Sequence, residues 1–132
     1  MSNIGIASGL TQDLAHRALD AATLRHAAYS KNVANASIPE YQPLRVSFED
    51  QLSLVRSDIL GRRNDGNAQR ALASIAPRVE QGALTSGSTD EKVRLDMEVA
   101  NMMQNAVWYQ SLLTALGKSS GILRMAIRGG SN

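Results

Sequence analysis

The carboxyl-terminal third of the chain carries an apolar heptad repeat that continues through more than four heptads. The series steps alternately by four and three residues, and only Ser120 interrupts its apolar character. Its positions are Leu95, Val99, Met102, Ala106, Tyr109, Leu113, Leu116, Ser120, Leu123 and Ile127. A repeat of this kind indicates a long helix that packs along one seam. We predict this helix over residues 89–128 with Thr89 as its cap, and at the usual helical rise it spans roughly 58 Å.

A second apolar flank lies beside this seam on the same predicted helix. It consists of Met97, Ala100, Met103, Val107, Trp108, Leu112 and Ala115. Together the seam and the flank form a stripe that is too wide for one partner helix to cover. We therefore expect this helix to contact more than one neighbour.

The amino-terminal segment predicts a second helix. Its apolar residues fall within one third of a helical wheel, at Leu10, Leu14, Ala18, Ala21, Leu24 and Ala28. We predict this helix over residues 9–36, with Ser8, Gly9 and Thr11 as alternative entry residues. Pro39 cannot continue a helix and stops it.

The middle of the chain, residues 37–88, is poorly patterned. Phe48, Leu52, Val55 and Ile59 follow Ser47 at helical spacing and predict a short helix that ends at Gly61. Residues 61–88 are punctuated by glycines and by Pro77, so we expect a loop with at most a short strand or hairpin.

The predicted fold is mainly α. Residues 1–132 form a single elongated unit, in which a motif turn, the short helix and the loop of residues 37–88 join the two terminal helices. The terminal helices form a coiled-coil-like core. Because two such helices do not enclose a core by themselves, we expect other chains to complete it.

Composition and spacing argue against most kinds of chemistry. The net charge of +2 is too near balance to suggest a nucleic-acid partner, and the absence of cysteine excludes thiolate chemistry. His16 and His26 are ten residues apart, which rules out a helical i, i+4 metal pair. Asp96 and Glu98 are two apart and are expected on a solvated face. We predict no enzyme, and no catalytic, cofactor-binding or metal-binding residue.

The chain carries no targeting signal of the ordinary kind. Its first residues lack both a basic segment and an apolar run, and nowhere do 18 apolar residues follow one another. We expect no membrane span. The protein is expected either to stay in the cytosol or to leave the cell by a route that does not read a cleaved signal peptide.

A motif at the end of the first helix points to a known family. Asn32, Ala34 and Asn35 form an Asn-x-Ala-Asn helix end, and Pro39 and Tyr41 follow in a turn. The carboxyl-terminal helix matches the same family at Leu95-Asp96, Glu98, Asn105-Ala106, Tyr109-Gln110, Leu116 and Ala126-Ile127. With these residues at both ends, the chain resembles the flagellar axial family of bacteria.

The turn departs from the family pattern at two positions. Ile38 stands where the family usually has threonine, and Glu40 stands where it usually has glycine. A turn that needs positive φ at Glu40 is therefore expected to be costly.

The resemblance implies a structural subunit of the proximal rod, which transmits torque as part of the flagellar drive shaft. It implies a place in the periplasmic rod of the basal body, reached through the flagellar type III apparatus without a cleaved signal peptide. The implied partners are other copies of the chain, the rod proteins FlgC and FlgF, the adaptor FliE, the membrane-ring base and the export gate.

The expected assembly interface combines the apolar positions of both helices with the motif. It comprises the heptad series without Ser120, the six apolar residues from Leu10 to Ala28, and Asn32, Asn35, Pro39 and Tyr41. Asparagines in such a seam can bond a neighbouring backbone and fix register where leucines would allow sliding.

A rival interpretation is a cytosolic helical adaptor or regulator that binds one partner through the same heptads. It explains the helices equally well, and an asparagine helix end with a proline stop is common. It does not explain the combined arrangement of asparagine, proline and tyrosine.

Overall fold

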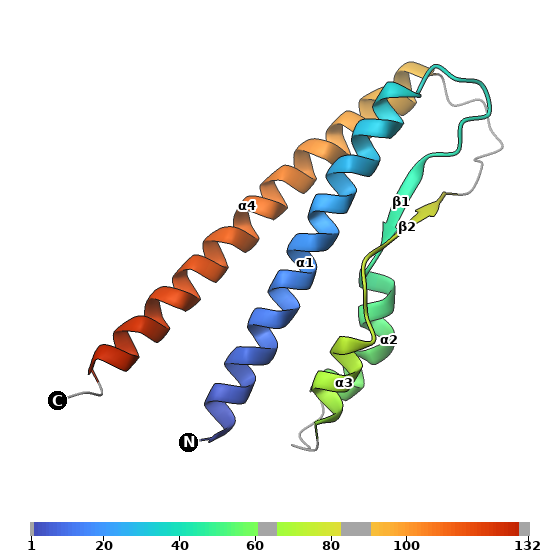
Figure 1. Cartoon of the computed structure of the whole chain (residues 1–132). Coiled ribbons are helices and arrows are strands. Elements are labelled where there is room, and N and C mark those ends of the chain that lie inside the picture. Colours follow the sequence, from blue (N-terminus) through green and yellow to red (C-terminus); the bar gives the residue numbers. More distant parts are fainter. Residues whose placement is uncertain (1, 61–65, 83–90, 130–132) are drawn as a thin grey trace.

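A computed structural model describes residues 2–60, 66–82 and 91–129 of the chain. Two long helices dominate it, α1 over Ser2–Ala34 and α4 over Glu91–Gly129 (Figure 1). They run in opposite directions, so α1 begins and α4 ends at the same end of the molecule. The elements between them are β1 (Leu44–Ser47), α2 (Glu49–Leu60), α3 (Asn67–Ala73) and β2 (Arg78–Gln81). The predicted mainly α fold with long terminal helices is confirmed.

The first helix differs from its predicted bounds of 9–36 at both ends. It begins at Ser2, so Ser8 and Gly9 lie inside it instead of marking its entry. A glycine in a helix costs only about 1 kcal/mol relative to alanine, which the helical turns on either side outweigh. The helix ends at Ala34, where Asn35 bonds the carbonyl oxygen of Lys31 through its backbone N–H at 3.0 Å and its Nδ2 at 2.7 Å.

Two short strands tie the middle of the chain together. β1 and β2 pair antiparallel, with Leu44 opposite Gln81 and Ser47 opposite Arg78. At the end of this pair the backbone N–H of Gly82 donates to the carbonyl oxygen of Pro43 at 2.7 Å. A Cβ on Gly82 would meet that oxygen at 2.9 Å, so the close approach requires glycine. The short strand expected within residues 61–88 is β2, but its partner lies outside that segment.

The helices of the middle segment confirm one prediction and correct another. The short helix expected between Ser47 and Gly61 is α2. The loop expected over residues 61–88 is wrong for Asn67–Ala73, which form α3. Seven residues are too few to display helical periodicity in the sequence. The burial of Leu72 against the rest of the molecule stabilises this short helix. Gly61 and the predicted cap Thr89 lie outside the described residues.

The cluster of buried apolar residues lies between α1 and the middle segment, and Leu112 of α4 packs at its edge. Ala18 and Ala21 of α1 are buried against Phe48, Leu72 and Ile75. Figure 1 accordingly shows α1 between α4 on one side and α2, α3 and the strands on the other. Nη1 of Arg17 also donates to the carbonyl oxygen of Ile75 at 2.6 Å, which anchors the segment after α3 to α1. The middle segment thus covers the apolar face of α1 within one chain.

Candidate assembly interface

The exposed apolar surface of the molecule is concentrated on α4. Large apolar side chains face solvent along most of its length, from near its start to near its end. They are Met97, Met103, Val107, Trp108, Tyr109, Leu113, Ile122 and Met125. Patches of this extent on a folded chain usually mark a protein contact. This surface is the first candidate for assembly.

The predicted heptad seam follows one flank of α4 and is only partly covered. Leu95, Val99, Met102 and Leu116 are half-buried, whereas Ala106, Tyr109 and Leu113 are exposed. The side chains of Leu123 and Ile127 lie outside the described residues. The seam contacts α1 only in part, as where the Ser30 hydroxyl of α1 donates to Sδ of Met102 at 3.8 Å, and Ala106, Tyr109 and Leu113 at its centre remain open to another molecule.

The line of α4 that does face α1 is shifted by one residue from the predicted seam. It runs through Glu98, Asn105, Leu112 and Ser119, at intervals of seven residues, and none of these side chains is exposed. Asn105 is buried, and its Nδ2 donates to the carbonyl oxygen of Ala22 on α1 at 2.8 Å. Because this line begins with two polar residues, a search for apolar spacing passes over it.

The apolar stripe of α1 is largely occupied within the chain. Ala18, Ala21 and Ala28 are buried, and Leu10, Leu14 and Leu24 are half-buried. Leu10 and Leu14 pack at the edge of the core formed with Phe48, Leu72 and Ile75. The small alanine side chains allow the neighbouring elements to approach α1 closely. Any contact of this stripe with another chain would have to be made at its half-buried edges.

Asn32 is the centre of the motif at the end of α1. It is buried, and its carboxamide bonds both backbone groups of Leu44: Nδ2 donates to the carbonyl oxygen at 2.9 Å, and Oδ1 accepts from the N–H at 2.7 Å. The side chain therefore acts as a strand partner for the first residue of β1. Oδ1 also accepts from the hydroxyl of Tyr41 at 3.3 Å, which fastens the turn to the helix.

The same asparagine reaches α4 through Glu98. Nδ2 of Asn32 donates to Oε2 of Glu98 at 2.9 Å, and Arg45 of β1 holds both carboxylate oxygens, with Nη2 to Oε1 at 2.8 Å and Nη1 to Oε2 at 3.2 Å. The prediction of a solvated face is thus correct for Asp96, which is exposed, and wrong for Glu98, which is 5% exposed. An acidic residue in a polar triplet gives no sign of its partner, because Arg45 lies 53 residues away.

The turn after α1 has the positive φ at Glu40 that a residue other than glycine adopts only at a cost in free energy. The N–H of Tyr41 donates to the carbonyl oxygen of Ile38 at 3.2 Å, which closes a four-residue turn with Pro39 at its second position. Glu40 at the third position has a φ of 61°. Proline followed by a positive φ is the pattern of a type II turn, for which glycine is the usual third residue. Pro39 and Glu40 are exposed and Tyr41 is half-buried.

A groove of about 530 Å³ separates α1 from the open part of the seam. Ala22, Thr23 and His26 line it from α1, and Ala106 and Tyr109 line it from α4. Its walls are mostly small or apolar. The groove and the exposed side chains of Tyr109 and Leu113 form one continuous candidate contact.

The described residues offer little for metal or membrane binding. His16 and His26 are both exposed on α1. Within the described ranges no group of three or more His, Cys, Asp or Glu residues could hold a metal ion. Of the helices that the structure describes, none combines the length and apolar character needed to cross a membrane.

This architecture defines a class of elongated helical proteins whose two terminal helices lie side by side and present an apolar face outward. Comparison with known proteins shows which of them the chain is similar to. Flagellar basal body rod protein FlgB of Borrelia hermsii is 29% identical over 118 residues, covering 80% of this chain and 85% of that protein. The protein of the same name from Bacillus subtilis is 26% identical over 128 residues, or 93% and 96% of the two chains. That of Borreliella burgdorferi is 27% identical over 110 residues, or 74% and 80%.

The resemblance to flagellar rod proteins predicted from the motif residues is therefore confirmed, and within them the similarity is to FlgB. This similarity supports the interpretation that the chain is a structural protein of the flagellar basal-body rod. No protein-family profile matches the chain. No solved structure matches it either.

Proposed function

We propose that the chain is a non-enzymatic structural subunit of the proximal rod of the bacterial flagellum, where it transmits torque as part of the drive shaft. The observation that carries this proposal is the row of exposed apolar side chains along α4, combined with the similarity to FlgB over most of the chain. A monomer gains nothing from such a surface, whereas neighbours in a rod would bury it.

The interface that we propose has a contacting part and a supporting part. The exposed seam residues Ala106, Tyr109 and Leu113 contact the neighbouring subunit directly, continued by the half-buried residues of the heptad series. The stripe from Leu10 to Ala28 and the motif residues Asn32, Asn35, Pro39 and Tyr41 hold α1 in the position that this contact requires.

Torque transmission needs contacts that do not slide. The α1–α4 pair is suited to this because polar bonds fix its register: Asn105 to Ala22, and Asn32 to Glu98. Buried polar pairs of this kind are satisfied in one register only. We infer that the helix pair moves as one rigid body when a neighbouring subunit pushes on α4.

The partners follow from the proposed place in the rod. They are other copies of the chain, FlgC, FlgF and the adaptor FliE, at the membrane-ring base. The chain would reach them through the type III export gate, without a cleaved signal peptide.

Purified basal bodies test this proposal against the cytosolic adaptor. The rod subunit should be recovered in basal bodies from the cell that makes it, with an intact mass that has lost at most Met1. A cytosolic adaptor would instead remain in the soluble fraction as a dimer or heterodimer. Absence from basal bodies, or the loss of some twenty amino-terminal residues, would contradict the proposal.

A further inference from the structure

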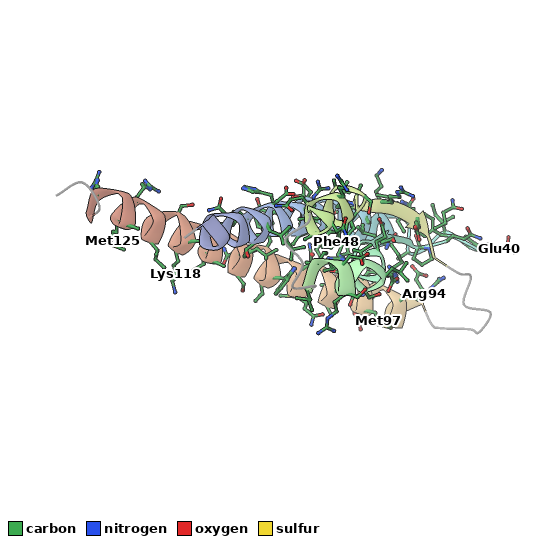
Figure 2. The ribbon with its side chains drawn as sticks, turned by 90° about the horizontal axis from the view of Figure 1, so that it is seen from below. Glu40, Phe48, Arg94, Met97, Lys118 and Met125 are labelled. Atoms are coloured by element: carbon green, nitrogen blue, oxygen red, sulfur yellow. The ribbon has the colours of Figure 1, made fainter. Side chains whose placement is uncertain are left out.

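A small pocket, whose lining surface is largely apolar but includes several polar side chains, lies at the end of the molecule where α1 stops and α4 begins. It has a volume of about 160 Å³, and its polar lining consists of Asn32, Tyr41, Arg45, Arg94 and Glu98. Figure 2 shows Arg94 and Met97 at the same end of the molecule as Glu40, opposite Lys118 and Met125. The pocket is therefore part of an end surface.

Arg94 is only partly satisfied in this pocket. One guanidinium nitrogen, Nη2, donates to the carbonyl oxygen of Ala36 at 3.2 Å, which fixes the side chain against the end of α1. Its Nε is buried, and among the described residues no acceptor bonds it. Among the described residues no carboxylate forms an ion pair with Arg94. A buried donor without an acceptor is uncommon in a folded protein and calls for a partner.

The one buried carboxylate of the pocket is already engaged. Glu98 accepts two hydrogen bonds from Arg45 and one from Asn32. Arg45 and Glu98 therefore pair with each other, which leaves Arg94 as the charged side chain of the pocket that has no ion pair among the described residues. The first turn of α4, which contains Arg94, adds the partial positive charge of a helix N-terminus. An anionic group is the complement of this arrangement.

We propose that this pocket receives the carboxylate of an aspartate or glutamate side chain from a neighbouring subunit, an inference that rests on the proposed rod function. The Nε–H of Arg94 is the donor that this carboxylate would accept, and Nη2 carries a second hydrogen besides the one that it donates to Ala36. The volume is that of roughly five water molecules, enough for a carboxylate and its last methylene.

The rim of the pocket favours a protein as the source of the carboxylate. Met97 is 56% exposed and lines the pocket together with Pro43. An arginine whose surroundings exclude water is a frequent anchor of protein–protein contacts. A free small anion would leave Met97 uncovered.

Replacing Arg94 with lysine places in the pocket an amine that can be cross-linked to a carboxylate. In basal bodies from cells that make the Arg94→Lys variant, a carbodiimide should join the new amine to the carboxylate that it contacts, and peptide mass spectrometry should identify that residue. The purified monomeric variant should not give the same product. Arg78→Lys, on the exposed strand β2, is the matched control and should give no product specific to basal bodies.

Two results would overturn the inference: coupling only to Glu91 or Glu98 in both samples, or no coupling at position 94 in the assembled variant. If Arg94→Lys fails to assemble although it unfolds at the same urea concentration as wild type, a contact at this position is required, as proposed.

The two proposals fail separately. Absence of the wild-type chain from basal bodies would refute the rod function. Its presence there with no coupling at position 94 would refute only the carboxylate contact. Arg94→Gln should reduce swarming several-fold more than Arg78→Gln, because it removes the charge without enlarging the side chain.

Discussion

Nδ2 of Asn32 lies 2.9 Å from Oε2 of Glu98, so one buried hydrogen bond joins the last turn of α1 to α4. The same carboxamide holds both backbone groups of Leu44. Few side chains supply a donor and an acceptor side by side as a peptide group does, and asparagine is the shortest of them. Three parts of the fold, the helix pair, the turn and the sheet, therefore depend on this residue.

Substitution of Asn32 should be far more damaging than substitution of Asn35. Asn32→Ala leaves the N–H of Leu44 without its side-chain partner and removes one of the two donors to the C=O, which Arg45 also bonds, and it should lower the free energy of unfolding by about 2–3 kcal/mol. Asn32→Asp should cost at least as much, because it places a second carboxylate against Glu98. Asn35 only bonds its own helix, so Asn35→Ala should cost about 0.5 kcal/mol. Urea unfolding followed by circular dichroism measures all three, and equal effects at both positions would contradict this role of Asn32.

The two partners of the Arg45–Glu98 ion pair should not be equivalent. The Arg45 side chain is 45% exposed and that of Glu98 is 7% exposed. Arg45→Ala leaves a buried carboxylate with Asn32 alone and should cost about 3 kcal/mol. Glu98→Ala leaves an arginine that water can reach, and should cost about 1–2 kcal/mol. Urea unfolding should therefore give Arg45→Ala a lower free energy of unfolding than Glu98→Ala. Asp96→Ala is the control and should be nearly neutral. The reverse order of the first two variants would show that Glu98 is more hydrated than its burial indicates.

Glycine at position 40 should stabilise the chain. A left-handed conformation costs a residue other than glycine about 1 kcal/mol, and Glu40 adopts one at a φ of 61°. Glu40→Gly should therefore raise the thermal midpoint. The matched control is Glu80→Gly in the exposed strand β2, where the added backbone freedom should lower the midpoint. A lower midpoint for Glu40→Gly would mean that the glutamate side chain makes a contact that outweighs the strain.

Neighbouring leucines on α4 should separate folding from assembly. Leu113 is 46% exposed, so Leu113→Asp should change the stability of the isolated chain by only about 0.5 kcal/mol. In a rod it would place an unpaired charge in an apolar contact, and such cells should export the subunit yet build no rod and fail to swim. Leu112 packs at the edge of the core, so Leu112→Asp should unfold the chain itself.

A surface control completes this comparison. Lys118 is exposed on the same helix, and Lys118→Ala cells should remain motile. Normal swimming of the Leu113→Asp strain would exclude this part of the seam from the subunit contact. Leu116→Asp should combine both defects, because Leu116 is half-buried.

Protection from hydrogen exchange should fall along α4 in the isolated chain. The part of α4 that includes Glu98 and Asn105 is bonded to α1, whereas Ile122 and Met125 are exposed. In Figure 1 the two helices also diverge toward the end of α4. Amides of residues 98–112 should therefore exchange more slowly than those of residues 113–129. Uniform strong protection of a proven monomer would contradict the need for neighbours.

The long helices, the short helix α2 and the family resemblance could all be predicted from the sequence. These depend on local signals: apolar spacing sustained over many turns, a proline stop, and motif residues close together in the chain. The sequence also marks Glu40 as the position where a positive φ would conflict with a side chain, and the structure gives Glu40 a φ of 61°.

The line of α4 that meets α1 and the contacts of the motif asparagine could not be predicted from the sequence and depend on the folded structure. The line through Glu98 and Asn105 is polar, so its burial depends on partners that are distant in sequence: Arg45 and Asn32 for the carboxylate, and the Ala22 carbonyl for the amide. A polar side chain is stable inside a protein only when such partners converge on it. Hydrophobic spacing carries no information about that convergence. The location of the core between α1 and the middle segment was hidden for the same reason, because Phe48, Leu72 and Ile75 meet Ala18 and Ala21 only after the chain has folded back on itself.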